Sequence, residues 1–318
     1  LSSELRSLKP RPHRTNQSTV TMATEEAWTQ LSGHAGNFQS GSRPGRVMKR
    51  LCQAEADCLQ ALASDPRLRD FAPAFYGIRR SPSDDSDSGV GAEFVEMQDL
   101  LAEFQAPVSL MDCKIGCRTY LEDELAMARR DAKPRPDMYR RIVETDPDAT
   151  TRAESGWRGH QAGLHAVAGA PVLHLLLGLP HRRLKRGDPD GSVAPPPFDD
   201  FKRLRRREDI LAMLAYFVDG VQAGGVARAY LERLRRLREA LTQSEFFPKH
   251  ELIGSSLLFV HDRAGRASVW MIDFGKTRPS PSRLSHTAEW SEGNHEDGYL
   301  TGLDNIIHLF QQLVNACA

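Results

Sequence analysis

The chain has 318 residues, and its 42 lysine and arginine residues are balanced by 42 aspartate and glutamate residues. This length is sufficient for one large or two smaller domains with a sizeable hydrophobic core. The zero net charge excludes the global basic field that many nucleic-acid-binding proteins carry, so we expect no nucleic-acid partner. Any anion site must therefore be a local cluster of positive side chains.

The five cysteines are an odd number and include no CxxC pair, which argues against a disulfide framework and a zinc site. They indicate a reducing, cytoplasmic environment. The first twenty residues contain no apolar run long enough for a signal peptide. The most apolar stretch, "VLHLLLGL" at 172–179, is far shorter than the ~20 residues that a membrane span needs, so no transmembrane segment is expected.

Residues 1–24 are polar and lack periodicity, which predicts a disordered N-terminal extension before a folded domain that begins near residue 25. Alternating or helical spacing then predicts, in order, two strands, a helix over "EADCLQALAS" and two further strands. The second strand is "RVMKR" and the last begins at "EFVEMQ". The Ser, Asp, Pro and Gly residues of "RRSPSDDSDSGVG" predict an exposed hairpin loop before that last strand.

The stretch "LMDCKIG", residues 110–116, predicts a strand with Asp112 and Lys114 on one face. Gly116 would let the backbone turn or approach a ligand closely. This arrangement suits a phosphoryl-transfer site, although a strand acid and a lysine could equally form a structural ion pair.

Three further patterns predict structure toward the C-terminus. The segment "TYLEDELAMARRDA" predicts a helix with Leu121, Leu125 and Ala128 on one face. Residues 208–244 have strong helical periodicity, with arginines on an outer face that we expect to be solvated. Finally, "GSSLLFVHDRAGRASVWMIDFGKT" predicts a hairpin that turns at Asp262–Arg266.

Five motifs occur together in this chain: "EMQDLL", "DCKIG", "SSLLFVHD", "IDFGKT" and "EGNHEDGYLTGLDN". The set resembles the inositol polyphosphate kinases, and most closely the inositol 1,4,5-trisphosphate 3-kinases, over residues 28 to about 150 and 198–310. No HRD-type catalytic loop precedes Asp273, which argues against a protein kinase. The resemblance implies an α+β fold of two lobes that binds ATP as protein kinases and SAICAR synthase do. Its N-lobe would cover about 25–107 and its C-lobe about 108–318, with an added helical inositol-binding lobe at about 135–215.

The resemblance also implies a nucleotide and metal site. Lys49 matches the lysine that contacts the ATP phosphates, although a lysine at a strand end is usually only exposed. A carboxylate such as Asp273, between "VWMI" and a Phe-Gly pair, is costly to bury, and Mg²⁺ would offset that cost. The resemblance adds Ser256 as a second metal ligand, where the alternative is a serine that caps a turn.

The adenine and ribose contacts are likewise implied by the resemblance. Residues Glu96 to Leu100 resemble the hinge that holds adenine through backbone groups, which includes Glu96 and Met97. Asp99 is placed for the ribose, and Lys276 is expected to contact the nucleotide.

For the second substrate, the resemblance implies that Asp112 orients or deprotonates the inositol 3-hydroxyl. Lys114 would contact the substrate and offset the charge that moves from ATP to that oxygen, and Met138 would pack on the sugar ring. These parts are the ones that phosphoryl transfer requires, because the reaction depends mainly on positioning and charge neutralisation.

Residues 155–187 do not resemble the family, although the family's inositol-binding lobe has most of its basic residues here. A one-base change of reading frame converts "LHAVAG" to "YMQWRE" and "LPHRRL" to "FRIEG", which are both family-like. We therefore hypothesise that this segment is translated out of frame, with compensating shifts near 150–160 and 185–195. The alternative is a lineage-specific insertion with its own fold.

The predicted function is phosphorylation of inositol 1,4,5-trisphosphate at the 3-hydroxyl, with ATP and Mg²⁺. The helical run 208–244, interpreted as an enlargement of the substrate lobe, favours this enzyme over a multikinase of broader substrate range. An ATP-binding but catalytically impaired scaffold protein is a third alternative. Calmodulin is a partner of related kinases, but residues 1–27 contain no sustained basic amphipathic helix of the kind it binds.

Overall fold

The computed structural model describes residues 37–80, 92–130, 204, 206–219 and 223–316, together with the backbone of 184–185. The chain separates into two compact units, Leu1–Gln30 and Leu31–Ala318, and every described residue belongs to the second. The predicted extension at 1–24, Met138 and the atypical segment 155–187, apart from the backbone of its strand residues 184–185, lie outside the described residues. The hypothesis of a shifted reading frame therefore stays a prediction.

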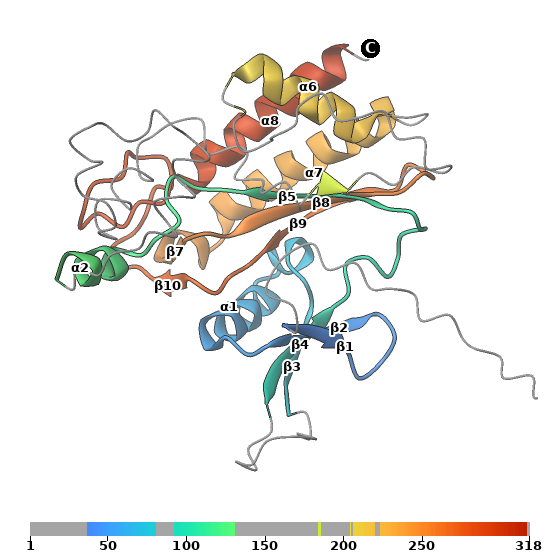
Figure 1. Ribbon diagram of the computed structural model, residues 1–318. Coiled ribbons are helices and arrows are strands. Elements are labelled where there is room, and N and C mark those ends of the chain that lie inside the picture. Colours follow the sequence, from blue (N-terminus) through green and yellow to red (C-terminus); the bar gives the residue numbers. More distant parts are fainter. Residues whose placement is uncertain are drawn as a thin grey trace, which may run out of the picture. The chain divides into compact units, whose positions relative to one another are not determined.

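The first group of elements is a four-stranded antiparallel sheet with a helix, in the predicted order of strand, strand, helix, strand and strand (Figure 1). Its elements are β1 (Phe38–Ser40), β2 (Arg46–Arg50), α1 (Gln53–Ser64), β3 (Phe75–Arg80) and β4 (Glu93–Gln98). A short 3-10 helix, η1 (Arg69–Phe71), lies between α1 and β3. The sheet order is β1-β2-β4-β3, so β4 is a central strand.

Alternation along these strands determines which side chains enter the core. Val47 on β2 and Val95 and Met97 on β4 are buried and belong to the same hydrophobic cluster as Leu59 and Leu62 of α1. Burial of such side chains is the main stabilising contribution to a sheet–helix layer. Lys49 is two residues after Val47 and therefore lies on the same face of β2.

The second group contains another four-stranded antiparallel sheet, in the order β6-β5-β8-β9. Its strands are β5 (Ser109–Lys114), β6 (Leu184–Lys185), β8 (Ser256–His261) and β9 (Ala267–Ile272). The register aligns Lys114 of β5 with Ser256 of β8, and Ser256 with Ile272 of β9. The predicted hairpin turn is confirmed, because the Asp262 amide donates to the Arg266 carbonyl at 3.0 Å.

Three helices lie on one face of this second sheet, as Figure 1 shows: α6 (Arg207–Val218), α7 (Ala223–Gln243) and α8 (Tyr299–Ala316). Tyr230 of α7 is fully buried and contacts the rings of Phe217, Phe259 and Phe310, with centroids 6.1, 5.2 and 5.5 Å away. The helical prediction for 208–244 is confirmed. Its interpretation as an enlargement of the substrate lobe is wrong, because both helices bury their apolar faces in the core of the second sheet.

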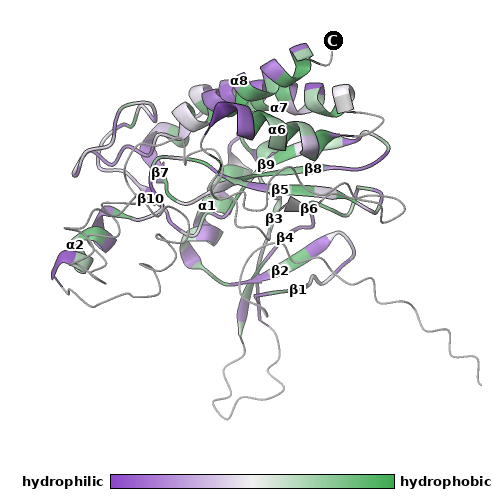
Figure 2. Ribbon diagram, turned by 45° about the horizontal axis from the view of Figure 1, so that its top comes forward, coloured by the Kyte–Doolittle hydropathy of each residue, from purple (hydrophilic) through white to green (hydrophobic). Residues whose placement is uncertain are grey.

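Figure 2 shows hydrophobic and hydrophilic stretches alternating around α8, as expected for a helix with one buried face. On the predicted outer face of α7, Arg228, Arg235 and Arg236 are exposed, whereas Arg233 and Arg238 are only partly exposed. Arg233 donates to the carbonyls of Val269 and Asp70 at 2.6 Å each. Its guanidinium also lies 4.8 Å from the Phe71 ring centroid, so this arginine joins α7 to β9 and η1.

Four smaller elements complete the described chain: α2 (Glu122–Arg130), the 3-10 helix η4 (Phe247–Lys249), β7 (His250–Leu252) and β10 (Thr277–Pro279). The expected apolar face of α2 is confirmed, because Leu125 and Ala128 are buried and Leu121 is buried just before the helix. Strands β7 and β10 pair with each other. No helix in the described ranges is long and apolar enough to cross a membrane.

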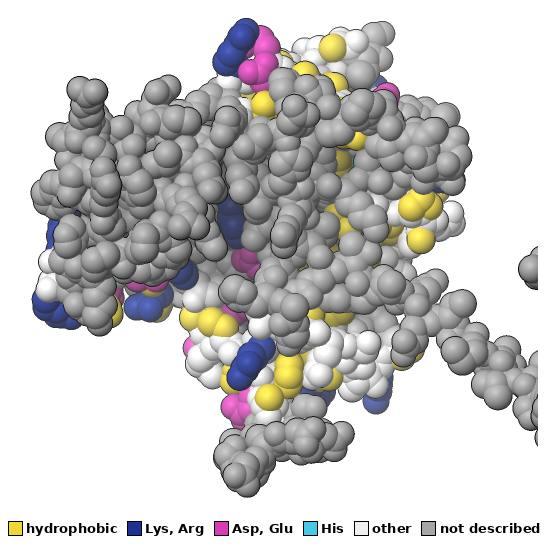
Figure 3. All heavy atoms as spheres, viewed as in Figure 1, with side chains coloured by type: hydrophobic (Ala, Val, Ile, Leu, Met, Phe, Trp, Pro, Cys, Tyr) yellow, Lys and Arg dark blue, Asp and Glu magenta, His cyan; other side chains and the backbone are white. Residues whose placement is uncertain are grey.

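The structure confirms the predicted α+β class, because each of the two larger sheets is antiparallel and packs with its own helices. Figure 3 shows basic and acidic side chains close together on the described part of one face. This mixture is what the equal numbers of positive and negative residues predict.

Candidate active site

Two lysines from different sheets meet at one carboxylate. The Lys49 ammonium on β2 lies 3.2 Å from Oδ1 of Asp273, and the Lys114 ammonium on β5 lies 3.0 Å from Oδ2. Lys49 also contacts Oε1 of Glu55, in the first turn of α1, at 2.8 Å. The three predicted residues Lys49, Lys114 and Asp273 are thus brought together from segments that are far apart in the sequence.

The backbone around Asp273 explains how the carboxylate reaches both lysines. Asp273 directly follows β9 and has a φ of 64°, a left-handed conformation that is uncommon outside glycine. Phe274, the next residue, is 1% exposed and anchors the turn in the core. Such backbone outliers persist where the surrounding structure holds them, and they cluster at functional sites.

The electrostatics of the three residues are coupled. Burial alone would raise the pKa of Asp273, but the positive charges of Lys114 and Lys49 outweigh it, and the pKa is lowered to about 2. Burial opposes the charged form of Lys49, yet Glu55 and Asp273 raise its pKa above the ordinary value. Asp273 and Lys49 are therefore both ionised at neutral pH.

The opposite side of the Lys114 ammonium is held by a backbone carbonyl. Lys114 donates to the carbonyl oxygen of Gly254 at 2.9 Å, two residues before Ser256. Ser256 is fully buried, and its hydroxyl has no hydrogen-bond partner among the residues that the structure describes. Ser256 pairs directly with Ile272, the residue before Asp273, so this hydroxyl lies near the carboxylate. A buried hydroxyl without a partner in the described structure is suited to bind a cation.

Asp112 lies two residues before Lys114 on the same face of β5. Its exposure is only 1%, and it is not among the described residues that line the neighbouring cavity. The structure thus brings Lys114 to the cavity. Asp112 is more deeply buried than we expected for a residue that contacts the acceptor hydroxyl.

A cavity of about 520 Å³ opens beside these groups. Lys49, Lys114 and Lys276 line it, together with the carboxylates of Glu55 and Asp273. Lys276 donates to the Thr119 carbonyl at 3.0 Å and to Glu124 of α2 at 2.7 Å, so it joins the cavity wall to that helix. Three lysines at one cavity create a local positive field that favours a polyanionic ligand.

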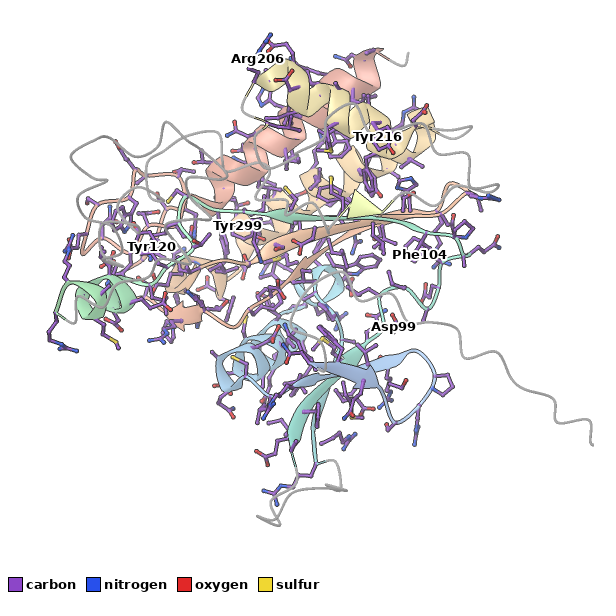
Figure 4. All side chains as sticks on the ribbon, viewed as in Figure 1. Asp99, Phe104, Tyr120, Arg206, Tyr216 and Tyr299 are labelled. Carbon is purple, nitrogen blue, oxygen red and sulfur yellow. The ribbon has the colours of Figure 1, made fainter. Side chains whose placement is uncertain are left out.

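Two residues of the expected hinge, Glu96 and Met97, lie inside the first sheet. Glu96 and Met97 lie within the central strand β4, which pairs with β2 on one side and β3 on the other. Main-chain groups of a central strand are directed at its neighbours, so they are not free to hold adenine. Asp99, beyond the end of β4, donates its amide to the Gly45 carbonyl at 3.0 Å and accepts the Leu101 amide at 3.0 Å through its side chain. Figure 4 labels Asp99 where the chain leaves the first sheet.

The Glu96 side chain takes part in a hydrogen-bonded cluster on the first sheet. It is fully buried, and it accepts hydrogen bonds from the amide and hydroxyl of Ser42 and from Arg79 at 2.9 Å. Arg46 lies 3.4 Å away. Burial would raise the pKa of Glu96, but these partners lower it to about 2. Glu96 thus fixes the turn between β1 and β2 on the sheet face opposite Lys49.

Two functional features were missed by sequence reasoning. Glu55 carried a usable signal, since an acid in the first turn of a helix that follows a lysine-bearing strand can reach that lysine. The Gly254 carbonyl carried none, because a backbone oxygen has no sequence signature.

A family model described as "Inositol polyphosphate kinase" matches residues 94–311. Among curated proteins, the chain is 46% identical over 293 residues to inositol-trisphosphate 3-kinase C of Mus musculus, covering 91% of this chain and 40% of that protein. It is 42% identical over 294 residues to inositol-trisphosphate 3-kinase A of Homo sapiens, covering 90% of this chain and 59% of that protein. The chain therefore spans less than two thirds of the length of these relatives.

Among solved structures, the inositol phosphate multikinase Ipk2 of S. cerevisiae, in complex with ADP and Mn²⁺, is 14% identical with a TM-score of 0.47. The similarity covers 85% of this chain and 99% of that one. Membership rests on the sequence match, which covers more than half of the chain and includes Lys114 and Asp273. This chain belongs to the inositol polyphosphate kinase family.

Proposed function

We propose that this chain transfers the γ-phosphoryl group of ATP to the 3-hydroxyl of inositol 1,4,5-trisphosphate and so forms inositol 1,3,4,5-tetrakisphosphate. The observation that carries this proposal is the convergence of Lys49 and Lys114 on Asp273 at a lysine-rich cavity. The proposal is also supported by family membership and by the names of relatives, which are trisphosphate 3-kinases. Those names are the reason for preferring a 3-kinase to a multikinase, since the argument from 208–244 no longer holds.

Lys49 is suited to the ATP phosphates, because an ammonium that is already fixed by Glu55 needs little reorganisation when an anion arrives. The Lys49–Glu55 pair corresponds to the strand lysine and helix glutamate that protein kinases require in place for catalysis. Asp99 and Lys276 remain the proposed ribose and nucleotide contacts. Glu96 acts in this proposal through the β1–β2 turn and not as an adenine ligand.

The residues present fit a divalent cation. Asp273 supplies an ionised carboxylate, and Ser256 supplies a buried hydroxyl without a partner in the described structure. The described residues contain no cluster of three His, Cys, Asp or Glu side chains that could hold a metal. Mg²⁺ does not require such a cage, because it commonly uses one or two carboxylates, waters and substrate phosphates. Bound there, Mg²⁺ would neutralise charge on the phosphates.

On the acceptor side, Lys114 is placed to offset negative charge as the phosphoryl group moves. Its ammonium already shares Asp273 with Lys49, so one carboxylate links the proposed nucleotide and acceptor contacts. Asp112 is proposed to orient the 3-hydroxyl, with its burial keeping the carboxylate in one conformation. Met138 and the basic residues of the inositol lobe fall outside the described residues, and their roles stay predictions.

A cytoplasmic location belongs to the same proposal. The cysteines at 52, 58, 113 and 117 are free thiols, which fits a reducing compartment. The prediction about calmodulin concerns residues 1–27, which are outside the described structure.

The experiment that tests this function offers the chain ATP, Mg²⁺ and, in separate reactions, inositol 1,4,5-trisphosphate and other inositol phosphates. A parallel form has residues 155–187 restored to the family-like frame. Selective formation of the 1,3,4,5-tetrakisphosphate supports the proposal, and comparable use of several inositol phosphates would favour a multikinase. ATP binding without turnover by either form would favour a scaffold, whereas turnover by the restored form alone would locate the defect in that segment.

A further inference from the structure

We propose that Asp297 is a positioning residue for Lys114. Its buried carboxylate and its backbone carbonyl fix the ends of β7 and β5, the two segments that hold the Lys114 ammonium. The inference rests on the proposed function for its kinetic consequence, but not for its structural one. Asp297 precedes α8 and is 1% exposed, and it does not line the cavity.

The first segment that Asp297 holds is the end of β7. Oδ2 of Asp297 accepts the backbone amide of Leu252 at 2.9 Å. Two residues later, the Gly254 carbonyl accepts the Lys114 ammonium at 2.9 Å. The position of the acceptor of Lys114 therefore depends on a strand end that Asp297 anchors.

The second segment is the end of β5. The carbonyl oxygen of Asp297 accepts the backbone amide of Cys117 at 2.6 Å, three residues after Lys114. Gly116 lies between them with a φ of +106°, and a Cβ atom on this residue would lie 2.9 Å from that same oxygen. The glycine in "DCKIG" therefore allows the Asp297 backbone to approach, and no side chain fits there.

A buried histidine fixes the Asp297 carboxylate itself. Nδ1 of His286 lies 2.8 Å from Oδ1 of Asp297, and Nε2 lies 3.0 Å from the Phe247 carbonyl. The imidazole also stacks on the Phe247 ring with a centroid distance of 3.7 Å. Both ring nitrogens therefore face oxygen atoms, which hold the imidazole in one orientation. Figure 4 labels Tyr299, whose amide completes the Oδ1 contacts at 2.9 Å.

Only one of the two lysines of the site, Lys114, depends on Asp297 for its position. Lys49 is held by Glu55 and Asp273, and neither of these contacts involves the Asp297 segment. Loss of Asp297 should therefore displace Lys114 and its acceptor and leave Lys49 in place. A misplacement of about 1 Å can lower turnover by about a hundredfold.

The test compares Asp297→Asn with Glu296→Gln. Asparagine keeps the size of the side chain but cannot accept hydrogen bonds at both of its terminal atoms, so the Leu252 or Tyr299 contact is lost. Glu296 is its neighbour, and its side chain accepts the amides of Ser285 and His286 at 2.8 and 2.7 Å, both in the loop before α8. Both variants weaken the loop, but only Asp297→Asn releases the segments that hold Lys114.

We expect Asp297→Asn to lower kcat for trisphosphate phosphorylation about tenfold to a hundredfold, with a change in KM for ATP of less than about threefold. Glu296→Gln should keep kcat within about threefold, since its contacts do not reach the lysine. A second readout needs no turnover. Competitive amine labelling of the ligand-free proteins, resolved by mass spectrometry, should show faster reaction at Lys114 in Asp297→Asn and no change at Lys49.

Equal effects of the two variants on kcat, or unchanged labelling of Lys114 in Asp297→Asn, would overturn the inference. If Asp297→Asn does not fold, His286→Asn provides the same test, because asparagine tolerates the φ of 60° at this position. That variant should also accelerate labelling at Lys114 and not at Lys49, and the absence of this contrast would refute the proposal. If the parent chain forms no tetrakisphosphate while the labelling contrast holds, the proposed function fails and the positioning role stands.

Discussion

Replacement of Asp273 by asparagine should lower the free energy of unfolding by about 2 kcal/mol at neutral pH. The two lysines lower the pKa of this carboxyl from 3.8 to about 2, and each pKa unit corresponds to about 1.4 kcal/mol. The Asp273 side chain is 26% exposed, so solvent screens part of its attraction to the lysines, and the expected loss of stability is about 2 kcal/mol. Asparagine accepts the left-handed backbone at this position, so backbone strain should add little.

The sign of the pH dependence follows from the lowered pKa. Because the folded-state pKa of Asp273 lies below its unfolded value of 3.8, its contribution is complete above that pH and is lost as the pH falls through about 2. The stability difference between the parent chain and Asp273→Asn should therefore be the same at pH 6 and pH 8.

Urea unfolding at both pH values measures the difference, provided that each protein unfolds in one cooperative transition. Asp304→Asn is a matched control, since Asp304 pairs with Arg238 at 2.5 Å but both side chains are more than a third exposed. Such exposed pairs contribute about 1 kcal/mol or less. A loss at Asp273 no larger than the loss at Asp304 would refute the reasoning that this carboxylate anchors two lysines.

Three further substitutions test other parts of the account. Ser256→Ala should leave the ligand-free protein as stable or about 1 kcal/mol more stable in urea unfolding, because it removes a buried hydroxyl without a partner in the described structure. The same variant should need a higher Mg²⁺ concentration for half-maximal activity. Glu96→Gln should cost about 2 kcal/mol in the same assay, because the fully buried side chain loses the charge that pairs with Arg79, while the exposure of Arg79 screens part of that attraction. Glu93→Gln on the same strand, at an exposed pair, should cost less than about 1 kcal/mol. Gly116→Ala should lower the melting temperature and the kcat together, because the added Cβ meets the Asp297 carbonyl at 2.9 Å; an unchanged melting temperature would contradict the tight approach.

Much of the fold could be predicted from local patterns. Alternation in "RVMKR" predicted the strand β2, and the polar turn at Asp262–Arg266 predicted the β8–β9 hairpin. These features depend on residues close in sequence, so the pattern contains the information. The placement of α6 and α7 could not be predicted in the same way, since periodicity identifies an apolar face but not the element that covers it.

Some residues of the candidate site could likewise be predicted from the sequence, and others could not. Lys49, Lys114 and Asp273 were predictable because the resemblance carries their motifs, and the structure brings them together. The burial of Glu96 was not predictable, because its partners Ser42 and Arg79 come from a turn and a neighbouring strand. The contact between Asp297 and Gly116 joins residues 181 positions apart, and only the folded chain shows why this position is a glycine.

The central claim is that Lys114 and its partners form a phosphoryl-transfer site, and its most direct test is the turnover of inositol 1,4,5-trisphosphate by the parent chain and by Lys114→Met. The methionine side chain keeps the length and removes the charge that meets Asp273. The variant should lose at least about a hundredfold in kcat, the effect of removing one preorganised charge from the reaction centre, while its KM for ATP changes little. Turnover by Lys114→Met at the parent rate would contradict the account.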